Sequence, residues 1–196
     1  MLERVSGKIV DWQIEKGILS DAERAVYRYA YELLLNQVIN ILIAVLIAVV
    51  FGAPLPVLLL LISYIPLRSF CGGYHADTNL GCTFVSAVMI WCMCWIYQNI
   101  REGLFITYYP FIYIVSGYFV IRYAPVQDKN KPLDEAEIIR YKRMSRVLWA
   151  LEMTIGVLLY FIRKRYGMVI AISHLFLSFM LIVGKLKLNK NYKCQN

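Results

Sequence analysis

The sequence predicts an all-α integral membrane protein of about six transmembrane helices, preceded by an N-terminal amphipathic helix. The chain of 196 residues is 60% hydrophobic and only 17% charged, which is too apolar for a soluble domain of this length. Its apolar residues gather in runs of roughly 20, the length that crosses a bilayer as a helix. The basic residues behind the net charge of +8 flank these runs, so membrane topology explains them better than a nucleic-acid partner.

Residues 2–17 predict an amphipathic helix that lies on the membrane surface. Its apolar residues recur at helical spacing, as in Val5, Ile9 and Trp12, and its charged residues lie elsewhere. The sequence SDAE at 20–23 is a capping box, in which a Ser and a Glu satisfy N–H groups of the first turn. A second helix is therefore expected to begin there and to run into the first apolar stretch.

Apolar stretches that qualify as transmembrane helices, some marginally, occur six times along the chain. The second stretch is short and contains prolines, so we expect it to tilt, break or end early at Pro66. The stretches are 30–51, 54–68, 82–100, 103–122, 146–162 and 167–184.

The distribution of Lys and Arg predicts that both termini lie in the cytoplasm. Only Arg101 and the cluster at 163–165 fall on the outer side of such an arrangement, and positive charge favours the inner side. The segment 68–82 is then cytoplasmic. The chain is predicted to be a single membrane domain, residues 1–196, and its parts are an N-terminal segment 1–29, a bundle 30–184 and a basic tail 185–196.

The segment 68–82, RSFCGGYHADTNLGC, is either an ordinary polar loop or a site. On one unbroken helix His75 and Cys82 would lie about 10 Å apart along the axis. That is too far for the hydrogen bond that a thiol nucleophile and its base need. The turn residues between them predict a break in the helix, with Asp77 or Asn79 capping the next helix.

The residue types in this segment suit a cysteine nucleophile. Cys82 is expected near a helix N-terminus, beside a His and within reach of Arg68, which is a favourable setting for thiol chemistry. Gly72 and Gly73 let the backbone approach a substrate, and their N–H groups could hold an oxyanion. Each residue also has a plainer interpretation, since Gly-Gly commonly forms a turn and an Arg beside an apolar run commonly anchors a helix at the interface.

A zinc site of Cys71, His75 and Cys82 is disfavoured, because the spacings match no common pattern and no fourth ligand is evident.

Polar residues inside the predicted spans are candidates for a second role. Asn36, Gln37 and Asn40 lie in the first span, and Glu152 and His174 lie in the fifth and sixth. Such residues are expensive in lipid and usually face a cavity or another helix. They could line a substrate cavity or form polar pairs between helices. They also motivate an alternative function, a small transporter or exporter of a peptide.

The filled pattern at 68–82 resembles the signature of the AgrB family, integral-membrane cysteine endopeptidases that process autoinducing-peptide precursors in Gram-positive quorum sensing. That pattern is an Arg, then Gly-Gly, an aromatic residue, His-Ala, and a Cys seven residues after the His. The stretch YAPVQDKNKPL at 123–133 is similar to a second recurring segment of the family. The resemblance covers essentially the whole chain, and a non-catalytic scaffold would not require the intact His and Cys.

The resemblance implies that Cys82 is the nucleophile, that His75 is its general base, and that Arg68 and Gly73 are needed for activity. Asp77 is one of several candidates to orient the imidazole. The implied partner is an AgrD-like precursor with an amphipathic leader, an internal Cys or Ser and an acidic tail. Cleavage before the tail leaves a thioester, which the internal residue attacks to close a thiolactone or lactone. A homodimer in the bacterial cell membrane is implied, with no metal and no other cofactor.

Lys129 and Lys131 belong to a basic loop at 129–146, which could attract the acidic tail of the precursor. The same charges could instead act only as a topology determinant.

Overall fold

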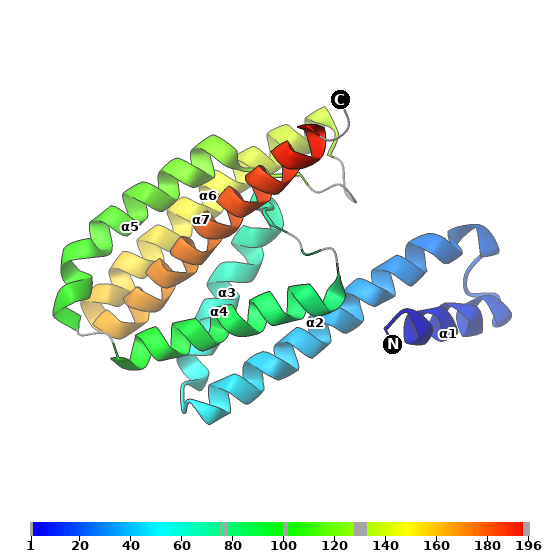
Figure 1. Ribbon diagram of the computed structural model, residues 1–196, viewed down its shortest axis with the longest axis horizontal. Helices are drawn as coiled ribbons and strands as arrows, with labels where there is room; N and C mark the ends of the chain where they lie inside the picture. Colours follow the sequence, from blue (N-terminus) through cyan, green and yellow to red (C-terminus); the bar gives the residue numbers. More distant parts are fainter. Residues whose placement is uncertain (1, 75, 77, 100–101, 128–132, 194–196) are drawn as a thin grey trace.

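The computed structural model describes all residues except 1, 75, 77, 100–101, 128–132 and 194–196. Within the described part the chain is helical and contains no strand, so the predicted all-α class is confirmed (Figure 1). The helices are α1 (Leu2–Glu15), α2 (Arg24–Val50), α3 (Pro54–Cys71), α4 (Asn79–Asn99), α5 (Glu102–Tyr123), α6 (Glu135–Ile162) and α7 (Lys164–Lys193), and a short 3-10 turn, Asp21–Glu23, leads into α2.

The helices are long enough to make this a multi-pass membrane protein. Over the described residues, α2 with its preceding turn, α3, α4, α6 and α7 are all long and apolar enough to cross a bilayer. Helix α5 has 22 residues and covers the fourth predicted stretch. Each of the predicted apolar stretches therefore corresponds to one helix.

Two predicted boundaries were wrong. Helix α3 does not end at Pro66 but continues to Cys71, with Pro54 in its first turn, where a missing N–H costs nothing. Helix α6 begins at Glu135, well before the predicted start at 146. A second capping box explains this early start, because the Asp134 carboxylate accepts the N–H of the residue three further on at 2.7 Å. Much of the predicted basic loop is therefore the first part of a helix.

Helix α1 packs against the N-terminal part of α2 through the face that carries Ser6 and Val10, both fully buried. The Ser6 hydroxyl donates to the Glu32 carboxylate at 3.3 Å. Val5 and Trp12 remain exposed. These two apolar side chains, which were predicted to face the membrane surface, are therefore not covered when α1 packs against α2.

The transmembrane helices form two groups. Helix α7 is at the centre of a bundle with α3, α5 and α6, and 72% of its apolar window is buried. Helices α2 and α4 pack against each other beside this bundle, and only 17% of each of their windows is buried (Figure 1). We call these groups the bundle and the α2–α4 pair.

Candidate active site

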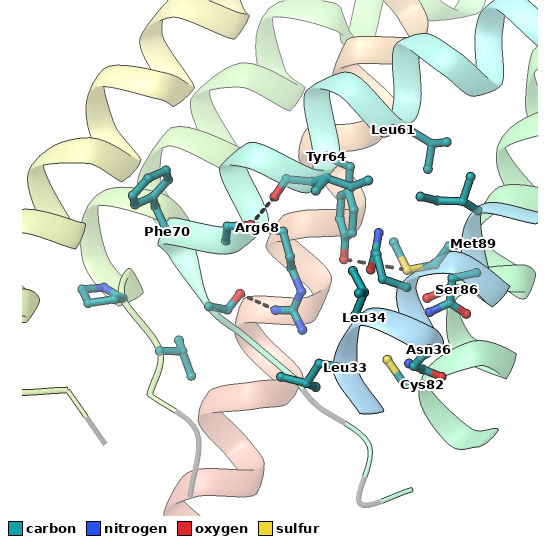
Figure 2. A pocket seen from close by; sticks show the side chains of 18 of the residues that line it. Leu33, Leu34, Asn36, Leu61, Tyr64, Arg68, Phe70, Cys82, Ser86 and Met89 are labelled. Carbon is teal, nitrogen blue, oxygen red and sulfur yellow. Dashed lines mark hydrogen bonds between the residues drawn. The ribbon is translucent and has the colours of Figure 1, made fainter. Parts of the chain in front are cut away.

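A cavity of about 730 Å³ lies where the α2–α4 pair meets the bundle (Figure 2). Helices α2, α3 and α4 form most of its wall, and residues 125–127 after α5 complete it together with Leu133 and Tyr141. The wall is largely apolar, with side chains that include Leu33, Leu34, Leu60, Leu61, Tyr64, Ile65, Phe70, Met89 and Ile90.

Many of the predicted site residues meet in this wall. The ones that line the cavity are Asn36, Gln37, Asn40, Arg68, Gly72 and Cys82. Gly73 is described but does not line it. His75, Asp77, Lys129 and Lys131 lie outside the described residues, so their predicted roles remain predictions.

The predicted break in the helix is confirmed, since α3 ends at Cys71 and α4 begins at Asn79. Thr78 supplies the cap of α4, because its hydroxyl accepts the N–H of Gly81 at 3.1 Å. The alternative that Asn79 caps this helix was wrong, because Asn79 is already its first residue. Cys82 consequently lies in the first turn of α4, as predicted.

Arg68 holds the backbone that follows α3. Its Nη1 donates to the carbonyl oxygen of Gly72, and its Nη2 donates to the carbonyl oxygen of Tyr74. The N–H of Tyr74 donates to the carbonyl oxygen of Met180 on α7 at 2.8 Å. The residue directly before His75 in the sequence is therefore fixed by both α3 and α7.

Gly72 and Gly73 make this arrangement possible. Their φ angles are 68° and 124°, in a region that L side chains rarely adopt. A Cβ on Gly72 would collide with the carbonyl oxygen of Val126, and a Cβ on Gly73 would collide with the Arg68 guanidinium. The prediction that these amides hold an oxyanion was wrong for Gly72, whose N–H donates to the carbonyl oxygen of Arg68 at 3.0 Å.

Sequence reasoning missed the residues that support this loop from behind. The N–H of Val126 donates to the carbonyl oxygen of Cys71 at 2.9 Å. A Cβ on Gly184 of α7 would lie 2.5 Å from the backbone of Gly73 and of Tyr74. An isolated glycine in an apolar helix is a signal of close backbone approach, so Gly184 could have been found. Val126 acts through main-chain atoms and gives no such signal.

The polar side of the cavity belongs to the α2–α4 pair. The Thr83 hydroxyl donates to Oδ1 of Asn36 at 3.2 Å, and Asn36 is only 8% exposed. One turn along α2, Oδ1 of Asn40 is buried with no hydrogen-bond partner among the described residues. Gln37 is exposed. The predicted binding residues thus differ in how firmly each is held.

The cysteines also differ in access. Cys71 and Cys94 are fully buried, whereas Cys82 is half-buried and lines the cavity. Cys92 is half-buried and does not line it. Of the cysteines in the described part, Cys82 is the one that a peptide in the cavity would meet. Among the described residues, no three His, Cys, Asp or Glu side chains lie close enough together to hold a metal ion.

Glu152 and His174 form a polar pair inside the bundle, away from the cavity. Nε2 of His174 lies 3.1 Å from Oε2 of Glu152, and both side chains are buried. The ring of Tyr113 packs edge-on against the imidazole at a centroid distance of 5.4 Å. Of the two interpretations of these residues, the pair between helices is the one that the structure has. Glu152 and His174 therefore no longer favour the alternative function of a peptide transporter.

These features define a class, a multi-pass helical membrane protein with an accessible cysteine in the wall of a cavity between its helices. The chain belongs to the Accessory gene regulator B (AgrB) family, whose model matches residues 3–181. An AgrB-like protein 2 of Clostridium perfringens is 25% identical over 155 residues, which are 74% of this chain and 70% of the relative. An AgrB-like protein of Listeria innocua is 28% identical over 131 residues, which are 66% and 63% of the two chains. No solved structure matches this chain.

Membership of this family implies that the chain takes part in the processing of an agr quorum-sensing peptide in the membrane, with an AgrD-like substrate.

Proposed function

We propose that this chain is a cysteine endopeptidase that removes the acidic tail of an AgrD-like precursor and promotes closure of a thiolactone or lactone. The observation that carries the proposal is the position of Cys82. It lies in the first turn of α4, in the wall of a largely apolar cavity of about 730 Å³ that Arg68 also lines. The filled AgrB pattern around it supports the same role.

In the first step, the sulfur of Cys82 attacks the carbonyl carbon of the peptide bond before the tail. His75 accepts the thiol proton as general base and returns it to the departing amine. The C–N bond breaks, the tail leaves with a new N-terminus, and the remaining peptide is bound to Cys82 as a thioester.

In the second step, the internal thiol or hydroxyl of the precursor attacks the thioester carbonyl. The ring closes as the bond to sulfur breaks, and Cys82 is released as a thiol. Closure competes with hydrolysis only if the internal group is held close and water is kept away. The apolar wall supports this requirement, with Leu34, Leu61 and Met89 facing the same space as Cys82 (Figure 2).

The proposed orientation puts the site and both termini on the cytoplasmic side. Successive helices alternate in direction, so the start of α2, the connection from α3 to α4 and the end of α7 lie at one end (Figure 1). Lys129 and Lys131 lie outside the described residues, and their proposed role is to attract the acidic tail by their charge. A thiol reagent that cannot cross membranes should reach Cys82 only from the cytoplasmic side, and labelling only from outside would contradict this orientation.

Co-expression with a cognate AgrD-like peptide tests the proposed activity. Release of the acidic tail should be abolished by Cys82→Ala and by His75→Ala. Cys92→Ala is the matched control, because Cys92 lies on the same helix but away from the cavity. Full tail release by the Cys82→Ala variant would refute the proposal.

A further inference from the structure

Attack by Cys82 would turn a substrate carbonyl into an oxyanion, which needs hydrogen-bond donors beside it. Backbone N–H groups at a helix N-terminus commonly supply them, but those next to Cys82 are engaged. The N–H of Cys82 donates to the carbonyl oxygen of Thr78 at 3.1 Å, and the N–H of Gly81 donates to the Thr78 hydroxyl at 3.1 Å.

In the loop before α4, two further N–H groups are engaged. The N–H of Gly72 donates within α3 at 3.0 Å, and the N–H of Tyr74 donates to α7 at 2.8 Å. Both terminal nitrogens of Arg68 donate to carbonyl oxygens of this loop. Side chains of the cavity wall are further candidates for the donor.

Asn36 of α2 carries a side-chain amide that is hydrogen-bonded to Thr83, the residue that follows Cys82 in the sequence. The Thr83 hydroxyl donates to its Oδ1 at 3.2 Å, and this bond does not use the Nδ2 donor. Asn36 and Cys82 line the same cavity and are drawn next to each other at its α2–α4 side (Figure 2). With 8% of its surface exposed, the amide is held in place and largely shielded from bulk water.

We infer that Asn36 is a catalytic residue whose Nδ2 donates to the oxyanion formed when Cys82 attacks a carbonyl. This inference rests on the proposed function, because it requires acyl transfer to Cys82. A fixed donor stabilises charge that develops in the transition state without reorganising, and removal of one such donor costs about 100-fold to 1,000-fold in rate. Thr83 is then a positioning residue, since it holds the amide beside the nucleophile.

Two small probes separate this role from a structural one. In p-nitrophenyl hexanoate, the sulfur of Cys82 attacks the ester carbonyl through an oxyanion, p-nitrophenolate leaves, and a hexanoyl thioester remains. Iodoacetamide alkylates the same sulfur by displacing iodide at a CH₂ group, and no oxyanion forms. Both rates would be measured on the full chain in lipid vesicles, with Cys82→Ala as the background.

The matched pair of variants is Asn36→Leu and Asn99→Leu, the same substitution at a residue of the cavity wall and at an exposed residue at the far end of α4 that does not line the cavity. We expect Asn36→Leu to lower acylation about 100-fold and to leave alkylation unchanged, whereas Asn99→Leu changes neither rate appreciably. A second variant, Asn36→Ala, removes the amide without adding bulk between α2 and α4 and should behave like Asn36→Leu.

The contradicting outcomes are separate from those of the proposed function. Unchanged acylation in both Asn36 variants overturns the inference, as does an equal fall in Asn99→Leu. A parallel fall in acylation and alkylation in both Asn36 variants overturns it too, because the residue would then only support the packing. If the wild-type chain shows no acylation that depends on Cys82, the proposed function itself fails, and the inference fails with it.

Discussion

The bundle surrounds a buried central helix, which the α2–α4 pair lacks, and the candidate site is built from both. In the bundle, 72% of the apolar window of α7 is buried, whereas the fraction is 17% for α2 and for α4, as it is for the bundle's outer helix α6. The loop before His75 is anchored to the bundle through α3 and α7, by Arg68 and by the carbonyl oxygen of Met180. Cys82 and Asn36 belong to the pair instead.

This difference suggests that the bundle and the α2–α4 pair have separate roles in the site. The bundle fixes one wall of the cavity through main-chain contacts that leave little freedom. The pair carries the nucleophile and lines the space that a peptide must enter, and it has fewer internal contacts to lose on adjusting to a substrate. Substitutions that loosen the bundle's hold on the loop should therefore impair chemistry while Cys82 itself remains accessible.

The largest effect is expected where α7 supports the loop. In Gly184→Ala, the new Cβ would lie 2.5 Å from the backbone of Gly73 and Tyr74, so the loop must shift. Misplacing a catalytic group by about 1 Å can cost roughly 100-fold, and we expect a fall of that size in the rate of tail release. The control is Gly7→Ala in α1, where a Cβ meets nothing within 4 Å. Equal rates of tail release in the two variants would show that the contact between α7 and the loop is not needed for activity.

A smaller effect is expected from Arg68→Lys, which keeps the positive charge but loses the guanidinium group with its two donating nitrogens. One ammonium group cannot reproduce two hydrogen bonds to the carbonyl oxygens of Gly72 and Tyr74. We expect tail release to fall about 10-fold, equivalent to roughly 1.4 kcal/mol, which is close to the lower end of the range for one charged hydrogen bond. Arg122→Lys, at an exposed site in the last turn of α5, is the control. An unaffected Arg68→Lys variant would favour a simple interface anchor.

The smallest effect on chemistry is expected inside the bundle. Glu152→Leu leaves Nε2 of His174 buried without its partner, which should lower the free energy of unfolding by about 1–3 kcal/mol. Glu152→Gln can keep the hydrogen bond and should lose less. Thermal unfolding in detergent measures the loss, and the rate of Cys82 alkylation should stay unchanged in both variants. Slower alkylation in a variant of unchanged stability would mean that this pair acts on the site.

The helices and the break before Cys82 could be predicted from the sequence because their signals are local. Apolar runs mark the spans, and turn residues mark the break. The early start of α6 was missed although its capping box at 134–137 is equally local, because the basic residues that follow suggested a loop. The early end considered at Pro66 was wrong, since α3 continues through this proline to Cys71.

The candidate site could be predicted only in its residue types. Arg68, Asn36 and Cys82 were expected to matter, and all three line one cavity. The contacts of Arg68 could not be predicted, because its partners are carbonyl oxygens that any residue has. The same holds for Met180, which is far away in the sequence and accepts through its backbone.

The most direct test of this account is to trap the acyl-enzyme. A cognate AgrD-like precursor, with its internal Cys replaced by Ala, should lose its tail but be unable to close a ring. Peptide mass spectrometry of the full chain should then find the remaining peptide as a thioester on Cys82. Release of the tail without any adduct on Cys82, or an adduct on Cys71 or Cys92, would contradict the account.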